Sequence, residues 1–295
     1  MNSEELQKLL EAGKIASKAR DYAKKFLKAG MPVIDVANKV EEKIFELGGK
    51  PSFPVCTSIN ENAAHCSYWD DKLKLKQGDL IKIDTGAHID GWIADCAFSY
   101  SIGKNEENET LIKASENALN AAIKIAKPKT EVREIGRAVN AEMEKLGVNP
   151  IKNLTGHLVQ RYKLHGPLSI PSFDNNDKTK LEEDMVIAIE PFATTGTGSV
   201  TEIKDFHIFR YIGKGTLRTS RDVLQHVVKE YYTLPFSRKW LLNKFGNLKT
   251  TIFLQQGVAN KLLESYGPLK VISGHKAAQT EHTIIVKEKP IITTK

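Results

Sequence analysis

Apolar residues recur at helical spacing in two segments of the chain, and the two segments match each other. In residues 33–48 the apolar positions are three or four residues apart, and the pattern ends at a glycine that suits a helix C-cap. The same pattern returns in residues 132–147, an offset of 99 from residue 33 to residue 132. Strand-like apolar runs follow, ending at Asp84 in the first case and Glu190 in the second. These near-constant offsets predict two α/β halves related by a pseudo-twofold axis.

A hairpin is predicted directly after the first of these strands. Residues 87–91 contain an Asp-Gly pair between two alternating runs, which is typical of a tight turn. The returning strand carries Asp95, so the side chains of Asp84 and Asp95 can face each other across antiparallel neighbours. In the second half, the expected partner of Glu190 is Glu281, which arrives 91 residues later. So long a connection exceeds a hairpin loop and predicts an insertion.

The insertion is expected over residues 205–272, where buried-type residues indicate a small helical subdomain packed beside the sheet. Three helices are expected within it, from Ser220 to Val228, around Leu241-Leu242 and from Val258 to Leu263. The main domain then comprises residues 1–204 and 273–295.

Composition and charge narrow the function classes. The 295 residues are 41% hydrophobic and 27% charged, as in ordinary globular proteins, and neither a membrane-spanning run nor a signal peptide is evident, so we expect no membrane partner. The three cysteines (Cys56, Cys66 and Cys96) lack zinc or redox spacing, and their odd number argues against a disulfide framework. A reducing, cytoplasmic setting is expected. The net charge of +7 is spread along the chain, which favours a solvated surface over a nucleic-acid-binding role.

Four acidic residues lie in or at the end of the strand-like runs: Asp84, Asp95, Glu190 and Glu281. Burying a carboxylate among β-branched residues is costly unless something positive neutralises it. No run of Arg or Lys accompanies these acids, so the pattern predicts metal ions at a shared centre. A two-metal site usually adds an imidazole, and His157, which follows a glycine in N-L-T-G-H, is the best candidate.

The other histidines are assigned by the repeat. His65 and His165 occupy equivalent places in the two halves, 100 residues apart, and both can flank the centre without being ligands. His88 and His207 have no such support and are expected on the surface or in loops. Strand alternation turns His282 to the face of its strand opposite the neighbouring acid.

Together the motifs resemble those of the methionine aminopeptidases, in that family's order and over almost the whole chain. They are G-K-P-S-F-P-V, N-E-N-A-A-H, K-I-D-T-G-A-H-I-D-G-W-I-A-D, N-L-T-G-H, K-L-H, A-I-E-P-F-A and E-H-T-I-I-V. The resemblance implies the pita-bread fold, an α/β (α+β) fold with two pseudo-twofold halves and a mainly antiparallel sheet covered by helices. The insertion is similar to that of the type II branch. Without a long basic N-terminal extension, the chain is more similar to archaeal members.

The resemblance also implies roles for individual residues. The five metal ligands of the family correspond to Asp84, Asp95, His157, Glu190 and Glu281. Asp95 and Glu281 take the bridging places between two divalent ions, which can be Co, Mn, Fe or Zn. The non-ligand active-site histidines correspond to His65 and His165. The residues that shape the methionine pocket correspond to Phe53, Leu164 and Tyr266.

The implied activity is hydrolytic removal of the initiator methionine from nascent proteins and peptides whose second residue is small. A metal-bridging water attacks the first peptide carbonyl, and Glu190 transfers protons as well as binding metal. His165 stabilises the oxyanion, and His65 contacts the amide beyond the scissile bond. The expected enzyme is a cytoplasmic monomer, with the ribosome as a further candidate partner. By the same rule the protein keeps its own Met1, because Asn2 is too large.

Two alternatives stay open at this point. A non-enzymatic pita-bread protein that binds RNA or chromatin shares the fold but usually lacks some ligands. A peptidase specific for Xaa-Pro bonds has a similar site but normally carries an extra N-terminal domain. A third hypothesis, an aspartic protease based on Asp84-Thr85-Gly86, is rejected because the matching position holds Glu190-Pro191.

Overall fold

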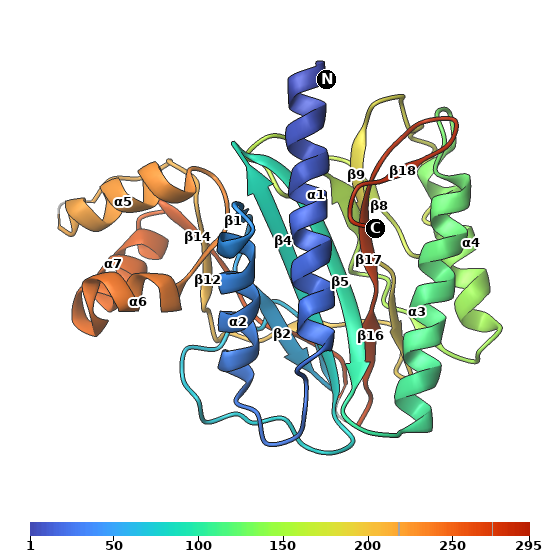
Figure 1. The fold of residues 1–295 in the computed structure, drawn as a ribbon, viewed down its shortest axis with the longest axis horizontal. Coiled ribbons are helices and arrows are strands. Elements are labelled where there is room, and N and C mark those ends of the chain that lie inside the picture. The colour runs from blue at the N-terminus through green and yellow to red at the C-terminus, as the bar shows by residue number, and fades with distance from the viewer. Residues whose placement is uncertain (218, 273) are drawn as a thin grey trace.

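Residues 1–217, 219–272 and 274–295 are described in this computed structural model. Helices cover one face of the central sheet, and the last three helices gather at one side of the molecule, beyond α2 (Figure 1). The helices are α1 (Ser3–Lys24), α2 (Val33–Glu46), α3 (Glu106–Ile125), α4 (Val132–Glu144), α5 (Arg221–Tyr231), α6 (Arg238–Phe245) and α7 (Asn247–Ala259). Among the residues described, none of these helices is long and apolar enough to cross a membrane.

The central sheet is antiparallel throughout its pairings. Its order is β1 (Lys50–Pro51), β4 (Leu80–Ile89), β5 (Trp92–Ser101), β17 (Glu281–Ile285), β9 (Val186–Ile189), β7 (Gly156–Leu158) and β8 (Ser169–Ile170). At its margins β2 (Cys56–Ile59) pairs with β4, and β18 (Ile291–Ile292) pairs with β17.

Small sheets complete the fold. One contains β16 (Ala277–Gln279), β10 (Phe192–Thr194) and β6 (Asn149–Pro150). Another contains β11 (Thr201–Glu202), β15 (Leu269–Lys270) and β3 (Asn62–Ala64). A third, on the side of α5 to α7, contains β13 (Phe236–Ser237), β12 (Ile208–Tyr211) and β14 (Leu263–Tyr266).

The predicted duplication is confirmed by how the helices pack on the sheet. Helices α1 and α2 bury their apolar faces against β4 and β5, with Ile81 and Ile83 among the buried residues. Helices α3 and α4 do the same against β9 and β17, where Ile187 and Ile284 are buried. Each half therefore places a helix pair on the same sheet face, which leaves the opposite face for chemistry (Figure 1).

The predicted hairpin is present and its turn is shorter than expected. Asp90 and Gly91 both adopt positive φ, at 49° and 83°, which matches the tight turn that Asp-Gly favours. Strand β4 runs on to Ile89, so His88 lies within the strand and is 7% exposed. The expectation that His88 is a surface or loop residue is therefore wrong. Its ring accepts a hydrogen bond from the Gly91 N–H at 3.1 Å, so it supports the turn.

The segment 205–272 contains α5, α6 and α7 and also the sheet formed by β13, β12 and β14. Helix α5 follows Ser220, as predicted. The helix expected around Leu241-Leu242 is α6, whereas the one expected from Val258 to Leu263 is wrong. Helix α7 occupies Asn247–Ala259, Lys261 then adopts a left-handed φ of 57°, and Leu263 opens β14. The boundaries of this insertion remain a prediction, and the proposed boundary residue 273 lies outside the described residues.

Candidate metal centre

The register of the central sheet brings the predicted acids together on the face away from the helices. Asp84 pairs with Ala97, which in turn pairs with Glu281, so these two acids flank one position of β5. Asp95 lies two residues from Ala97 and therefore shares its face. Glu190 directly follows β9, the strand beside β17. Adjacent strands thus supply all four carboxylates.

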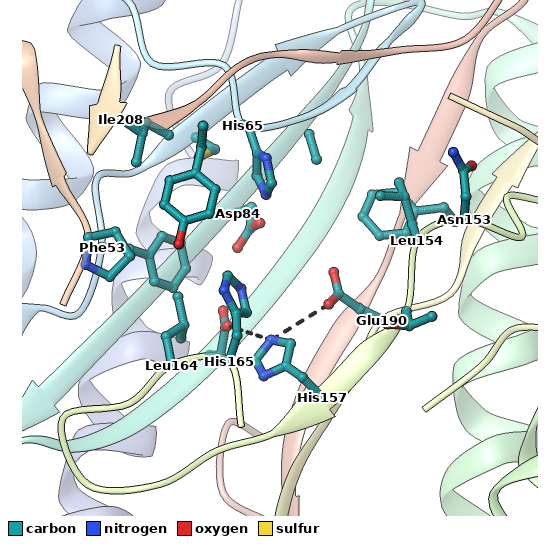
Figure 2. Close-up of a pocket in the computed structure, with 17 residues that line it drawn as sticks. Phe53, His65, Asp84, Asn153, Leu154, His157, Leu164, His165, Glu190 and Ile208 are labelled. Carbon is teal, nitrogen blue, oxygen red and sulfur yellow. Dashed lines mark ion pairs between the residues drawn. The ribbon is translucent and has the colours of Figure 1, made fainter. Parts of the chain in front are cut away.

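His157 completes the cluster from the next strand, β7. Its Nε2 lies 3.6 Å from Glu190 Oε1 and 3.8 Å from Asp95 Oδ2, and Figure 2 shows the ring directed at Glu190. One ligand atom each from Asp95, His157 and Glu281 lie within 4.8 Å of one another. That spacing is compatible with a single cation contacting all three residues.

One residue that sequence reasoning missed lies among the acids. Gln279, on β16, directs its Nε2 toward Asp84 Oδ2 at 3.4 Å, Glu190 Oε2 at 3.3 Å and Glu281 Oε2 at 3.4 Å. A single amide nitrogen has two hydrogens, so it cannot satisfy three carboxylates at once. The residue arrives in A-A-Q-T-E, two positions before Glu281, and a neutral amide gives no charge signal in the sequence.

The cluster is strongly perturbed electrostatically. Burial raises the pKa of Asp84 to about 7. Burial, followed by repulsion from the neighbouring acids, raises the pKa values of Asp95, Glu190 and Glu281 well above their usual range. Burial lowers the pKa of His157 to about 4, so its imidazole is neutral at physiological pH. Without a cation, the centre is stable only by holding protons.

The residues fit a divalent metal ion. Asp84 Oδ1, Asp95 Oδ1 and Glu281 Oε1 are buried and have no hydrogen-bond partner among the described residues. Carboxylate oxygens with one neutral imidazole are a donor set suited to first-row divalent ions, and a cation would satisfy these orphaned oxygens. Such a buried Asp, His and Glu cluster indicates divalent-metal binding.

A cavity of about 270 Å³ opens onto the cluster. All but one of the sequence-predicted site residues line it, and the exception, Glu281, is 1% exposed beneath it. Those lining residues are Phe53, His65, Asp84, Asp95, His157, Leu164, His165, Glu190 and Tyr266. The structure therefore gathers into one site residues that are more than 200 positions apart in the sequence.

The two flanking histidines stand at the cavity beside the acids (Figure 2). The ring centroids of His165 and His157 are 4.6 Å apart in an edge-to-face arrangement, and those of His65 and Tyr266 are 5.8 Å apart. Burial lowers the pKa values of both His65 and His165, which keeps them neutral. His65 also has a left-handed backbone (φ 61°), a strained state typical of functional loops.

Comparison with known proteins decides the family. The model of metallopeptidase family M24 matches residues 7–288. The chain belongs to metallopeptidase family M24. This membership makes it a metal-dependent hydrolase and confirms both the predicted enzyme class and the family resemblance. A metallopeptidase needs residues that bind metal, which explains why this chain buries a cluster of carboxylates.

Relatives and solved structures extend the family match. A methionine aminopeptidase of Pyrococcus abyssi is 43% identical, over 98% of this chain and 99% of that protein. The crystal structure of a methionine aminopeptidase from Thermotoga maritima has a TM-score of 0.75 at 23% identity and covers 100% of this chain and 98% of its own. The structure of a thermophilic Arx1 has a TM-score of 0.88 at 16% identity, with 99% and 91% covered. The two structures confirm the predicted pita-bread fold.

Other cavity residues of this M24 protein were not predicted. Cys56 directly follows the motif G-K-P-S-F-P-V and Asn153 begins the motif N-L-T-G-H, so this adjacency was the available signal. Ile208 and Pro235 come from the segment 205–272 and carry no sequence signal. Residues of that segment thus form part of the cavity wall.

The remaining histidine and cysteine predictions can be compared directly with the structure. His207 lies in the loop before β12, as expected, and its Nε2 is 3.0 Å from Asp205 Oδ1. His282 points away from the acids, as predicted, and its Nδ1 is 2.9 Å from Thr294 Oγ1. The cysteines are free and buried, which confirms that they form no disulfide framework.

Proposed function

We propose that this M24 protein is a methionine aminopeptidase with a centre for two divalent ions. It removes the N-terminal methionine from nascent proteins and peptides whose second residue is small. The observation that carries the proposal is the convergence of four buried carboxylates and a neutral imidazole at an apolar-walled cavity. The 43% identity to a methionine aminopeptidase supports the choice of substrate.

The cavity wall supports an unbranched apolar side chain as the ligand. Phe53 is 5% exposed and Leu164 is 6% exposed, and the ring of Tyr266 lies near His65 and His165. A thioether chain gains free energy by leaving water and by contact with aromatic edges. We assign Phe53, Leu164 and Tyr266 to the methionine slot, and we attribute the preference for a small second residue to the limited cavity volume.

Five residues of the cluster are suited to hold the metal ions. Asp84, Asp95, His157, Glu190 and Glu281 would hold the ions. Bound divalent ions would lower the pKa of a water molecule and so supply a nucleophile at neutral pH. Gln279 Nε2 lies within 3.4 Å of three of these carboxylates and can help to orient two of them at a time.

Protein side chains perform the proton transfers. Glu190 takes a proton from the attacking water and passes it to the leaving amine, a role suited to a carboxylate that lines the cavity beside His157. His165, neutral and beside His157, donates a hydrogen bond to the carbonyl oxygen as negative charge develops there. His65 contacts the amide beyond the scissile bond.

The setting of the enzyme is inferred from its cysteines and its net charge. Free, buried cysteines fit a reducing compartment, so we place the enzyme in the cytoplasm. We propose that it acts as a monomer on chains that leave the ribosome, and its net charge of +7 is compatible with an acidic partner there.

A peptide panel tests the substrate assignment. The metal-loaded protein is expected to cleave Met-Ala-Ser rapidly, Met-Lys-Ser slowly, and Leu-Ala-Ser or Ala-Pro-Ser at a small fraction of the Met-Ala-Ser rate. Faster cleavage of Ala-Pro-Ser would instead identify an Xaa-Pro peptidase. Absence of any cleavage with Mn²⁺, Co²⁺, Fe²⁺ and Zn²⁺ would favour the non-enzymatic alternative.

A further inference from the structure

A buried ion pair outside the metal centre joins the segment 205–272 to helix α2. Lys239 Nζ, on α6, lies 2.8 Å from Glu41 Oε2, and the two side chains are only 7% and 9% exposed. The indole Nε1 of Trp240 donates to the same oxygen at 3.0 Å, and Lys239 also donates to Asn38 Oδ1 at 2.8 Å. All donors to this oxygen thus come from one turn of α6.

The other oxygen of Glu41 reaches the wall of the active-site cavity. Glu41 Oε1 accepts the backbone N–H of Val55 at 3.3 Å. Val55 is 1% exposed and lies between Phe53 and Cys56, both of which line the cavity. Its neighbour Pro54 has no N–H to donate, so the Glu41 contact fixes the backbone between Ser52, which donates to Gly86, and Cys56, which pairs with Asp84.

The same part of the chain also contributes to the cavity directly. Pro235 lines the cavity and precedes Lys239 by four residues, and β13 at Phe236–Ser237 connects them. Docking of α6 on α2 therefore places Pro235 in the cavity wall and, through Glu41, also holds the segment that contains Phe53 and Cys56. A pair of apolar residues of similar volume could fill the junction equally well, but could not accept the Val55 N–H.

We propose that Glu41 is a positioning residue that couples the docking of α6 to the width of the methionine slot. This inference rests on the proposed function, because it assigns the slot to the substrate's first side chain. Glu41 acts through Val55 and Phe53, and it does not touch the metal cluster. Its loss is expected to weaken substrate binding rather than the chemical step.

Two double variants separate this role from simple stabilisation. Glu41→Met/Lys239→Met replaces the ion pair with apolar side chains and removes the acceptor for Val55. Glu41→Gln/Lys239→Met also removes both charges but keeps an acceptor oxygen. Glu42→Gln, an exposed acid on the same helix, is the matched control.

The expected result is a split between KM and kcat. Glu41→Met/Lys239→Met (the Met/Met variant) should raise KM for Met-Ala-Ser about 10-fold and keep kcat within about 2-fold of the wild-type value. The reason is that binding of the ground state and of the transition state weakens equally. The preference of the Met/Met variant for Met-Ala-Ser over Leu-Ala-Ser should fall by a similar factor. Glu41→Gln/Lys239→Met (the Gln/Met variant) and Glu42→Gln should keep the wild-type KM and the wild-type preference for Met-Ala-Ser over Leu-Ala-Ser.

Amide hydrogen exchange of residues 52–57 supplies a readout that does not depend on catalysis. Faster exchange is expected in the Met/Met variant and wild-type exchange in the Gln/Met variant. If the Met/Met variant does not fold, Trp240→Phe, which removes one donor to Glu41, should raise KM and exchange in the same direction.

The outcomes distinguish the two proposals. Equal KM, preference and exchange in the two double variants would overturn the role of Glu41. The wild-type protein could also cleave no methionyl peptide while amide exchange of residues 52–57 still depends on the side chain at position 41. That result would support the coupling and refute the proposed function.

Discussion

Two buried acidic environments in this protein differ in how their charge is balanced. Glu41 has a lysine 2.8 Å away, and each of its oxygens accepts a hydrogen bond. Three of the four carboxylates of the metal centre share one amide donor, and three oxygens of the cluster have no partner among the described residues. The first environment is complete as folded, whereas the second requires protons or cations.

The difference shows how to separate a structural charge from a functional one. Both sets of acids are buried, so burial alone does not identify the active site. What identifies it is the deficit of donors together with the direct opening to a cavity. The experiments below challenge this distinction.

The largest effect is expected at the metal centre. His157→Ala or Glu190→Ala should lower kcat/KM for Met-Ala-Ser by about 10³-fold or more, because each removes a proposed ligand and Glu190 also transfers the proton. His226→Ala, on α5, is the control and should keep wild-type activity. Near-normal cleavage by either variant at saturating metal would refute the assignment.

The next effect concerns the buried ion pair. Lys239→Met alone leaves Glu41 buried without a cation and should lower the free energy of unfolding by about 3–5 kcal/mol. Urea unfolding measures this loss. A change below about 1 kcal/mol would mean that the junction between α6 and α2 is solvated and does not depend on the pair.

A pH-dependent effect is expected in the metal-free protein. Burial raises the pKa of Asp84 to about 7, above its usual value of 3.8, so the folded state binds a proton more tightly than the unfolded state. This contribution to stability is fully present below pH 3.8 and is lost as pH rises through about 7. Asp84→Asn cannot ionise, so its stability relative to wild type should rise by roughly 1 kcal/mol per pH unit between pH 5 and 7.

The control for this effect is the same comparison with metal bound. Urea unfolding with a chelator and with saturating Mn²⁺ measures both cases. The bound cation favours the ionised carboxylate of Asp84. It should therefore remove the gain in the free energy of unfolding that Asp84→Asn has over the wild type. If the difference in the free energy of unfolding between Asp84→Asn and the wild type does not change with pH in the chelated protein, the account of the acidic cluster is contradicted.

The smallest effect is expected at an exposed pair on the same side of the molecule. Lys50 Nζ lies 2.7 Å from Glu230 Oε1, but the side chains are 52% and 40% exposed. Lys50→Met should therefore change the free energy of unfolding by less than about 1 kcal/mol. A loss as large as that of Lys239→Met would show that solvent exposure does not determine how much each of these ion pairs contributes to the free energy of unfolding.

Local patterns allowed much of the fold to be predicted. The helices over residues 33–48 and 132–147 follow from their apolar spacing, and the turn at Asp90-Gly91 follows from residues that tolerate positive φ. The helix predicted from Val258 to Leu263 was wrong because Lys261 adopts φ 57° without the glycine that usually marks such a stop, so α7 ends at Ala259. His88 was misplaced because the turn was predicted to be longer than it is.

The candidate site was predictable where charge conflicts with an apolar strand. Such a conflict marks each of the four acids, and the repeat relates them. Gln279 and Glu41 were missed for opposite reasons. Gln279 carries no charge, and Glu41 lies on an amphipathic helix where an acid is ordinary, its lysine partner being 198 residues away. Contacts of that sequence separation leave no periodic signal.

The central claim is that the acidic cluster is a catalytic metal centre, and a metal titration followed by activity tests it most directly. The chelated protein, titrated with Mn²⁺ while bound metal and cleavage of Met-Ala-Ser are both measured, should be inactive at first. Cleavage should then rise as up to two ions bind per chain, and Glu190→Ala should remain inactive throughout. Full cleavage by a protein that contains no metal, or binding of two ions that leaves it inactive with every divalent metal tried, would contradict the account.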